Sequence, residues 1–155
     1  MKNKNIYDEI FEKACSVCGK EIKKDIYEQG KCPYCNWKNN HLADVNPESV
    51  IYPNLISLNK AKKLFKEGKS FEPDLDEFLE ALHNYYEMQF EYNGIYYAVE
   101  LKRDKQKDLK ISLYNSQTKQ TQFFDTDEEF IENAKIEDKF LKDIWEKTTD
   151  RYWLQ

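Results

Sequence analysis

Two Cys-x-x-Cys steps constrain the fold of this chain more than any other feature of its sequence. The first is "CSVC" and the second is "CPYC", and together they contain all four cysteines: Cys15, Cys18, Cys32 and Cys35. Two residues between cysteines allow one tight turn to present both sulfurs at one edge of a tetrahedron, and Zn²⁺ accepts four thiolates in that geometry. The spacing therefore predicts a zinc site that joins two turns of the chain.

The residues around each pair suit such a site. The backbone must reverse just after the second cysteine of a pair, and the residues there, Gly19 and Asn36, are the types that best tolerate a left-handed conformation. The intervening segment predicts a short hairpin whose apolar side chains cover the metal: Ile22, Ile26 and Tyr27. Nearby lysines can offset the double negative charge of a zinc tetrathiolate: Lys13, Lys20, Lys24, Lys31 and Lys38.

Cys-Pro-Tyr-Cys is also the active-site motif of glutaredoxins, with Cys32 as the nucleophile and Cys35 as the resolving thiol. In that setting the motif opens a helix whose N-terminus lowers the thiol pKa. Here it is followed by "NWKNNHLADVNP", which does not predict a good helix. The redox hypothesis also leaves the other cysteine pair unexplained, and paired disulfides are disfavoured in an intracellular chain. We therefore prefer zinc and keep a thiol oxidoreductase as the weaker alternative.

A site with four cysteine ligands is structural, because no coordination position stays open for water. His41 and His83 are spare candidate ligands, but a lone histidine is more often a surface or core residue. The sequence has no glycine-rich phosphate loop and no nucleophile elbow. We therefore predict that the protein is not an enzyme.

The first part of the chain resembles the cysteine-rich CPCC domain of small bacterial proteins. The resemblance lies in "CSVCGK", in "GKCPYCNWKNN" with Trp37 two residues after the last cysteine, and in "NLISLNKAKKLFKEG", and it runs from residue 14 to about residue 69. The first knuckle differs, because the family usually has Cys-Pro-x-Cys-Cys where this chain has Cys-Ser-Val-Cys. The resemblance implies a zinc-ribbon-like fold, and some family members look like immunity or accessory factors.

Composition divides the chain into two expected domains, residues 1–70 and residues 71–155. The first has 13 lysines and 9 acidic residues, whereas the second has 11 basic and 20 acidic residues. No apolar run approaches the roughly 18–20 residues that cross a bilayer, and residues 1–17 lack the apolar core of a signal peptide. Lysine outnumbers arginine 22 to 2, which is typical of a low-GC bacterium or its phage. We expect a soluble, cytoplasmic protein without a membrane partner.

Hydrophobic periodicity predicts an α+β fold. In the first domain, Ser57 or Asn59 can begin a short basic helix that ends at Gly68. In the second domain, Pro73 suits the first turn of a helix. Residues 87–101 then predict two strands joined by the hairpin pair "NG", and "KISLYN" and "TQFFD" predict two more.

Two helices are expected after these strands. Thr126 and Glu129 form a capping box in "DTDEEFIENAKI", and "KFLKDIWEK" continues the helical spacing. The predicted architecture is an N-terminal zinc ribbon with a short helix, followed by helices packed on one face of a four-stranded antiparallel sheet.

These features favour a non-enzymatic zinc protein that acts by binding another protein, and its acidic second domain suits a basic partner. The sharpest version of this hypothesis is an immunity or accessory role. The alternative is a nucleic-acid-associated zinc ribbon in which lysines of the first domain contact phosphates: Lys20, Lys23, Lys24, Lys31 and Lys38.

Overall fold

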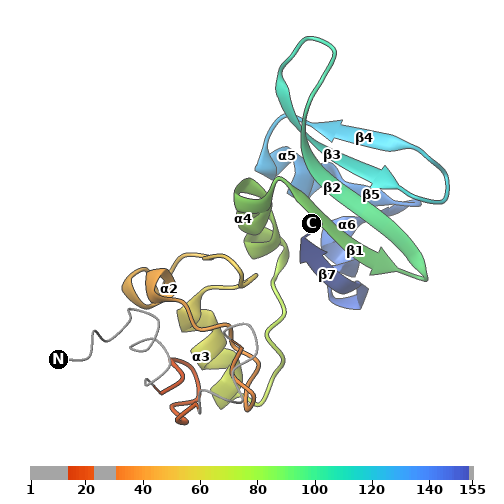
Figure 1. Cartoon of the computed structure of the whole chain (residues 1–155). Helices are drawn as coiled ribbons and strands as arrows, with labels where there is room; N and C mark the ends of the chain where they lie inside the picture. The colour runs from red at the N-terminus through yellow and green to blue at the C-terminus, as the bar shows by residue number, and fades with distance from the viewer. Residues whose placement is uncertain (1–13, 23–30, 154–155) are drawn as a thin grey trace. The chain divides into compact units, whose positions relative to one another are not determined.

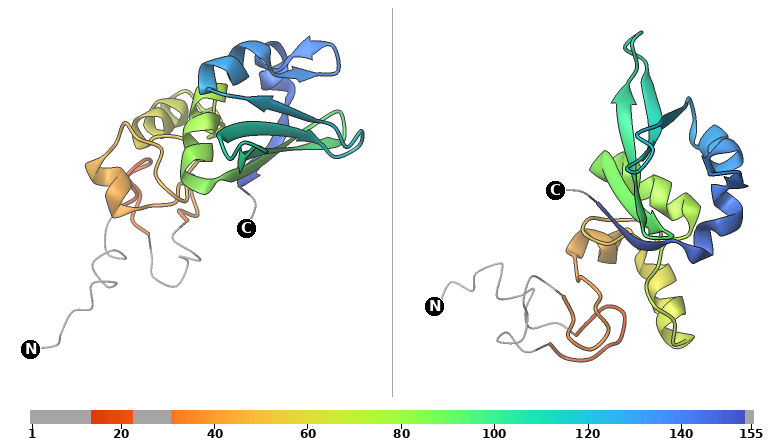
Figure 2. Two further views of the ribbon diagram at one scale, coloured as in Figure 1. Left: turned by 90° about the horizontal axis from the view of Figure 1, so that it is seen from above. Right: turned by 90° about the vertical axis from the view of Figure 1, so that its right-hand side faces the viewer.

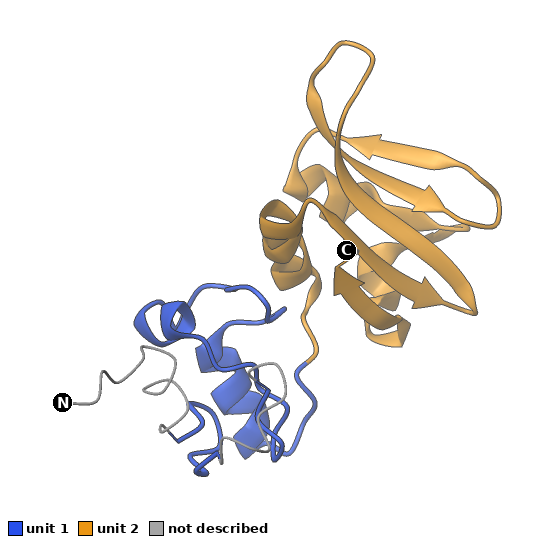
Figure 3. Ribbon diagram, viewed as in Figure 1, with its two compact units in different colours: residues 1–71 blue, residues 72–155 orange. Residues whose placement is uncertain are grey.

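The structure is a computed structural model that describes residues 14–22 and 31–153. The chain divides into two compact units, residues 1–71 and residues 72–155 (Figure 3). Most of the predicted inter-knuckle hairpin, including Ile26 and Tyr27, lies outside the described residues, as do Lys13, Lys23 and Lys24. Ile22 is described and is buried in the core of unit 1.

The described residues of unit 1 form the two cysteine turns and, after them, two helices (Figure 1). An isolated antiparallel bridge closes each turn, Ala14 with Glu21 and Lys31 with Lys38. The helices are α2, His41–Val45, and α3, Leu58–Lys66. The buried residues form one cluster that includes two of the sulfurs: Cys15, Ile22, Cys32, Trp37, Ala43, Ile56, Leu58 and Ala61.

The predicted helix of unit 1 is confirmed, and a second, shorter one was missed. The Ser57 hydroxyl caps α3 by accepting from the Lys60 backbone N–H, and Gly68 has the left-handed φ of 67° that ends the helix. The unpredicted helix is α2, where the Asn40 side chain accepts from the Leu42 backbone N–H. An asparagine that weakens a helix interior is therefore acting here as a cap.

Unit 2 begins with helix α4, Leu75–Tyr85, and continues into four strands. These are β1, Glu87–Tyr92; β2, Ile95–Arg103; β3, Leu109–Asn115; and β4, Thr121–Phe124. The remaining elements are α5, Asp127–Asn133; β5, Lys135–Ile136; β6, Lys139–Phe140; α6, Leu141–Ile144; the 3₁₀ helix η2, Trp145–Lys147; and β7, Thr149–Trp153. The predicted hairpin turn is confirmed, because Asn93 and Gly94 have φ of 51° and 76° between paired strands.

Helices α4, α5 and α6 lie on one face of the sheet (Figure 2). The core between them is largely aromatic. Phe90 of β1 stacks on Tyr97 of β2 at 5.3 Å and meets Trp145 and Phe78 edge-on at 5.6 and 6.1 Å. Such edge and offset contacts suit the ring quadrupoles, so these rings fix the helical layer against the sheet.

The sheet has five strands in the order β4-β3-β2-β1-β7, so the prediction of a four-stranded sheet was wrong. The fifth strand, β7, pairs antiparallel with β1. Its anchor is Arg151, whose guanidinium lies 4.8 Å from the Trp145 ring and donates to the Trp145 carbonyl and the Glu72 carboxylate. A strand that depends on pairing with β1 and on an arginine contact with Glu72 has no local signal in its sequence.

The end of the chain also contains less helix than predicted. "DTDEEFIENAKI" is helical only to Asn133, because the backbone of Ala134 is extended and begins the small β5–β6 hairpin. The expected capping box is half present: Thr126 accepts from the Glu129 N–H, but the Glu129 carboxylate accepts from Asp125 instead. A full capping box occurs on α4, between Asp74 and Glu77, one residue after Pro73.

The aromatic core predicts a sharp contrast between two phenylalanines of unit 2. Phe90 is fully buried and Phe123 is 52 % exposed. We expect Phe90→Ala to lower the free energy of unfolding of unit 2 by about 3–5 kcal/mol, and Phe123→Ala to change it by about 0.5 kcal/mol or less. Urea unfolding followed by the amide NMR signals of residues 72–153 measures both, and equal losses would contradict this packing.

Candidate metal centre

The four cysteine sulfurs converge in unit 1. All four Sγ atoms lie within 4.8 Å of one another. The Cys15 and Cys35 sulfurs are 3.6 Å apart, and the Cys18 and Cys32 sulfurs are 3.7 Å apart. These separations are far longer than the roughly 2.05 Å of a disulfide, and all four cysteines are free thiols. They match the edge of about 3.8 Å that four sulfurs have around a zinc ion at 2.3 Å.

The two turns that carry the sulfurs have the same backbone hydrogen bonds. In the first turn, Cys15 N–H donates to the Lys20 carbonyl at 2.9 Å, and Gly19 N–H donates to the Cys15 carbonyl at 2.9 Å. The second turn has the equivalent bonds, from Cys32 N–H to the Trp37 carbonyl at 2.7 Å and from Asn36 N–H to the Cys32 carbonyl at 2.8 Å. Each turn therefore presents its cysteine pair in one repeated geometry.

The left-handed residues that close the turns are those that the sequence predicts. Gly19 has a φ of 72° and Asn36 has a φ of 66°. The first turn also forms without the proline and third cysteine that are usual in the family motif, since its geometry depends on the left-handed residue rather than on the residues between the cysteines. The sequence departure at "CSVC" therefore leaves the four-sulfur set intact.

Asn39 supports the first turn from outside and is a residue that sequence reasoning missed. Its Oδ1 accepts from the Ser16 backbone N–H at 2.9 Å, which fixes the orientation of the amide. Its Nδ2 is buried with no hydrogen-bond partner in the structure as described, and the side chain lies against Cys15. A buried N–H without an oxygen acceptor fits a metal-bound sulfur, because outer-shell donors commonly orient metal ligands.

Other asparagines hold the chain that follows the second turn. The Asn54 side chain accepts from the Lys38 backbone N–H at 3.3 Å and donates to the Lys38 carbonyl at 2.8 Å. A paired strand would make the same two bonds with its backbone. Asn40 donates to the Tyr52 carbonyl at 2.6 Å. Asparagine side chains in the sequence after "CPYC" therefore hold neighbouring backbone segments together by hydrogen bonds. Their only sequence signal is the frequency of asparagine.

Burial and hydrogen bonding set the thiol pKa values in opposite directions. Burial by itself raises the pKa of Cys15, but the backbone N–H groups of Cys18 and Val17 and the side chain of Asn39 together hold it below its usual value. Burial raises the pKa of Cys32 and of Cys35 above the usual value. A bound dication reverses this effect of burial, because it favours the thiolates.

Three of the five lysines expected near the centre are among the described residues: Lys20, Lys31 and Lys38. The Lys20 ammonium lies 4.6 Å from the centre of the exposed Tyr34 ring, a surface contact worth about 1 kcal/mol or less. Lys31 and Lys38 face each other across an antiparallel bridge, where like charges repel. Burial and the charge of Lys31 both lower the pKa of Lys38.

The glutaredoxin-like motif does not open a helix. Residues 33–35 form a turn, and the next helix, α2, begins only at His41. Neither histidine joins the sulfur group. His41 is exposed at the start of α2, and His83 belongs to unit 2, where its Nε2 lies 2.8 Å from the Asp127 carboxylate. Within the described residues, the candidate ligand group contains the four cysteines alone.

Comparison with known proteins agrees with this geometry. Residues 13–81 match the family model described as Cysteine-rich CPCC, which confirms the resemblance seen in the sequence. No curated protein matches the chain, and no solved structure matches it. Among the helices of the described residues, none is long and apolar enough to cross a membrane.

The left-handed turns can be tested by exchanging residues at the two equivalent positions. Gly19→Ala should destabilise unit 1 by about 1–2 kcal/mol, because alanine is strained at positive φ, and nothing lies within 4 Å of the added Cβ. Asn36→Gly, the matched change in the second turn, should be neutral or stabilising. Thermal unfolding followed by amide NMR of residues 31–71 measures both, and a neutral Gly19→Ala would argue against this backbone.

Proposed function

We propose that this chain is a non-enzymatic zinc-binding protein whose cysteine-rich CPCC region holds one structural Zn²⁺ between Cys15, Cys18, Cys32 and Cys35. The supporting observation is the convergence of all four sulfurs on two turns of identical hydrogen bonding. Zinc suits this donor set because it takes four thiolates tetrahedrally. Iron also binds four cysteines, so the experiment must identify the metal.

A structural role follows from the closed donor set and from the position of the sulfurs. Four protein ligands leave no place on the metal for a reacting water. Cys15 and Cys32 are also part of the buried cluster of unit 1, beside Trp37 and Ala43. Metal binding would therefore contribute to folding, and structural zinc in small fingers contributes roughly 10–16 kcal/mol of apparent binding energy.

Thiol oxidoreductase activity has less support. A catalytic first cysteine needs a lowered pKa, commonly supplied by a helix N-terminus. Cys32 lies in a turn, is 0 % exposed, and has a raised pKa because of burial. These surroundings favour an unreactive Cys32 thiol. A bound metal would make its sulfur even less available as a nucleophile.

The biological role that we propose is binding to another protein in the cytoplasm, as an immunity or accessory factor. Unit 2 supplies the acidic surface for a basic partner. Exposed aromatic side chains accompany its acidic residues on the strands: Tyr96, Phe123 and Tyr152. Aromatic residues are enriched at protein interfaces because they bury much area at little entropic cost.

A nucleic-acid-associated role is the second candidate, and one observation favours it. Helix α3 carries Lys62, Lys63 and Lys66 at spacings that place them on one exposed face. Lysines so arranged can contact consecutive phosphates. The charge excess of unit 1 is small, so we rank this role below protein binding.

The metal proposal predicts the behaviour of a matched pair of variants. Native mass spectrometry of the full chain should show one zinc ion, and Cys32→Ser should lose it together with the folded amide signals of residues 31–71. Tyr34→Ser, a change of an exposed residue in the same turn, should keep both. Unit 2 should stay folded in either variant. Native signals in metal-free Cys32→Ser would disprove a metal-dependent fold.

The two candidate roles predict opposite responses to salt and nuclease. If the protein binds a protein, affinity capture from its host should yield a stoichiometric partner that survives nuclease treatment. If it binds nucleic acid, affinity for an oligonucleotide should fall steeply with salt, and replacing Lys62, Lys63 and Lys66 with glutamine should flatten that slope by about one per lost contact. Capture of nucleic acid alone would refute the preferred role.

A further inference from the structure

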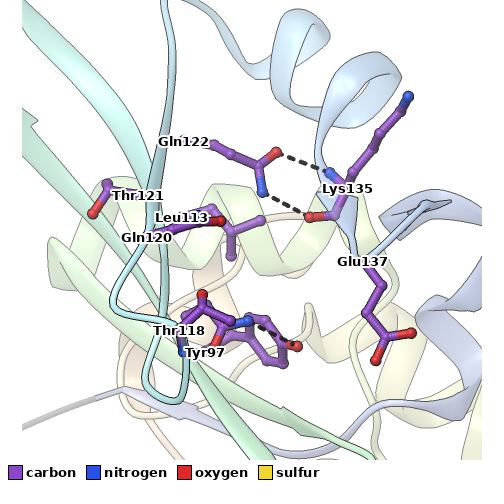
Figure 4. Close-up of a pocket in the computed structure, with 9 residues that line it drawn as sticks. Tyr97, Leu113, Thr118, Gln120, Thr121, Gln122, Lys135 and Glu137 are labelled. Atoms are coloured by element: carbon purple, nitrogen blue, oxygen red, sulfur yellow. Dashed lines mark hydrogen bonds between the residues drawn. The ribbon is translucent and has the colours of Figure 1, made fainter.

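Unit 2 contains a pocket of about 380 Å³ that is lined in part by Tyr97, a ring of its aromatic core (Figure 4). Its floor is Tyr97 and Leu113, which are 2 % and 1 % exposed. Both lie on the face of the sheet that carries the helices, because Tyr97 pairs with Phe90 across β1 and β2. The opposite wall is β5 and the turn that follows it, represented by Lys135 and Glu137. This volume suits a small organic group.

Hydrogen bonds hold the two walls of the pocket at a fixed separation. The Gln122 side chain donates to the Lys135 carbonyl at 2.7 Å and accepts from the Lys135 N–H at 3.1 Å, so it joins β4 to β5. Asn115 accepts the backbone N–H groups of Gln117 and Thr118 and thereby shapes the β3–β4 turn at the rim. The pocket is therefore part of the fold.

Of the two charged residues that line the pocket, Lys135 and Glu137, only Glu137 presents its charged group to it. Lys135 points its ammonium away, over the Phe140 ring at 4.7 Å from the ring centre, and only its backbone faces the pocket (Figure 4). The Glu137 side chain extends on the Tyr97 side of the pocket and makes no hydrogen bond or ion pair with any residue that the structure describes. Burial, with the added charge of Glu137, raises the pKa of Tyr97, so the hydroxyl stays neutral at pH 7.

Glu137 is the one side chain of the pocket lining that can only accept hydrogen bonds, whereas the hydroxyl and amide groups beside it can accept as well as donate. The Tyr97 hydroxyl receives only a long bond of 3.4 Å from Asn115. The hydroxyl and amide side chains of Thr118 and Gln120 line the rim. Glu137 lies in the turn between β5 and β6 and has a left-handed φ of 58°, an uncommon conformation for a residue with a side chain.

We infer that this pocket binds an organic cation rich in N–H donors, a guanidinium or primary ammonium group, with Glu137 as its counter-charge and the Tyr97 hydroxyl as a second acceptor. A planar guanidinium offers several donors in a fixed fork and pairs with a carboxylate by charge-assisted bonds. The pocket lies within unit 2 and needs no metal. The cation can be a free small molecule or the arginine side chain of a protein, which present the same group.

The test uses the full chain and two probes of the same shape, of which only one is a cation. Butylguanidinium should shift the amide NMR signals of Asn115, Gln122 and Glu137, whereas butylurea, its neutral isostere, should not. Glu137→Gln should weaken butylguanidinium binding by about tenfold, the loss expected for one charge-assisted contact. Glu146→Gln removes an exposed acid that does not line the pocket and should leave binding unchanged.

A second experiment with peptides distinguishes a free small cation from the arginine side chain of a partner protein. A short peptide with one arginine is compared with the same peptide carrying citrulline. Binding of both butylguanidinium and the arginine peptide indicates a partner side chain, and binding of butylguanidinium alone indicates a free small molecule. Equal binding of butylurea, shifts centred elsewhere, or no binding of either cation overturns the proposal, whatever the outcome of metal analysis.

Discussion

The convergence of four sulfurs is the constraint on which unit 1 depends. Two turns with the same hydrogen bonds bring Cys15 against Cys35 and Cys18 against Cys32. Isolated bridges close these turns, and no strand longer than a bridge occurs among the described residues of the unit. Such short pairings contribute little stability alone. The close spacing of the thiols therefore suits metal ligands. A bound metal would supply the cross-link that the sparse secondary structure lacks.

Unit 2 is stabilised by a different interaction, the packing of buried aromatic rings between its helices and its sheet. Its sheet is covered on one face by helices through buried rings, with Phe90 in contact with Tyr97, Phe78 and Trp145. The Tyr97 ring also lines a pocket, whose other wall includes Lys135 of β5 and Glu137 of the turn that follows it. Two units with such different stabilising interactions can divide the work of the protein. Unit 1 brings four thiols together, and unit 2 contains a pocket between its sheet and the β5–β6 hairpin.

The features that sequence reasoning predicted are those with local causes. The cysteine spacing, Gly19 and Asn36 after the knuckles, the Ser57 cap and the Asn93-Gly94 turn each act through neighbouring residues, and each lies where it was expected. The features that it missed depend on distant contacts. Strand β7 pairs with β1, and its Arg151 donates to Glu72, which lies 79 positions away. The pocket needs β4 and β5 to be joined by a glutamine side chain. No periodicity in the sequence records such contacts.

The support from Asn39 illustrates the same limit at the metal centre. It lies 23 positions from its partner Ser16, so only the fold reveals that its amide belongs beside Cys15.

The most direct test of the central claim is X-ray absorption at the metal edge of the purified full chain. We predict one zinc ion per chain with a single shell of four sulfurs at about 2.3 Å. A shell that contains nitrogen or oxygen, or a metal-free protein with intact thiols, would contradict the account.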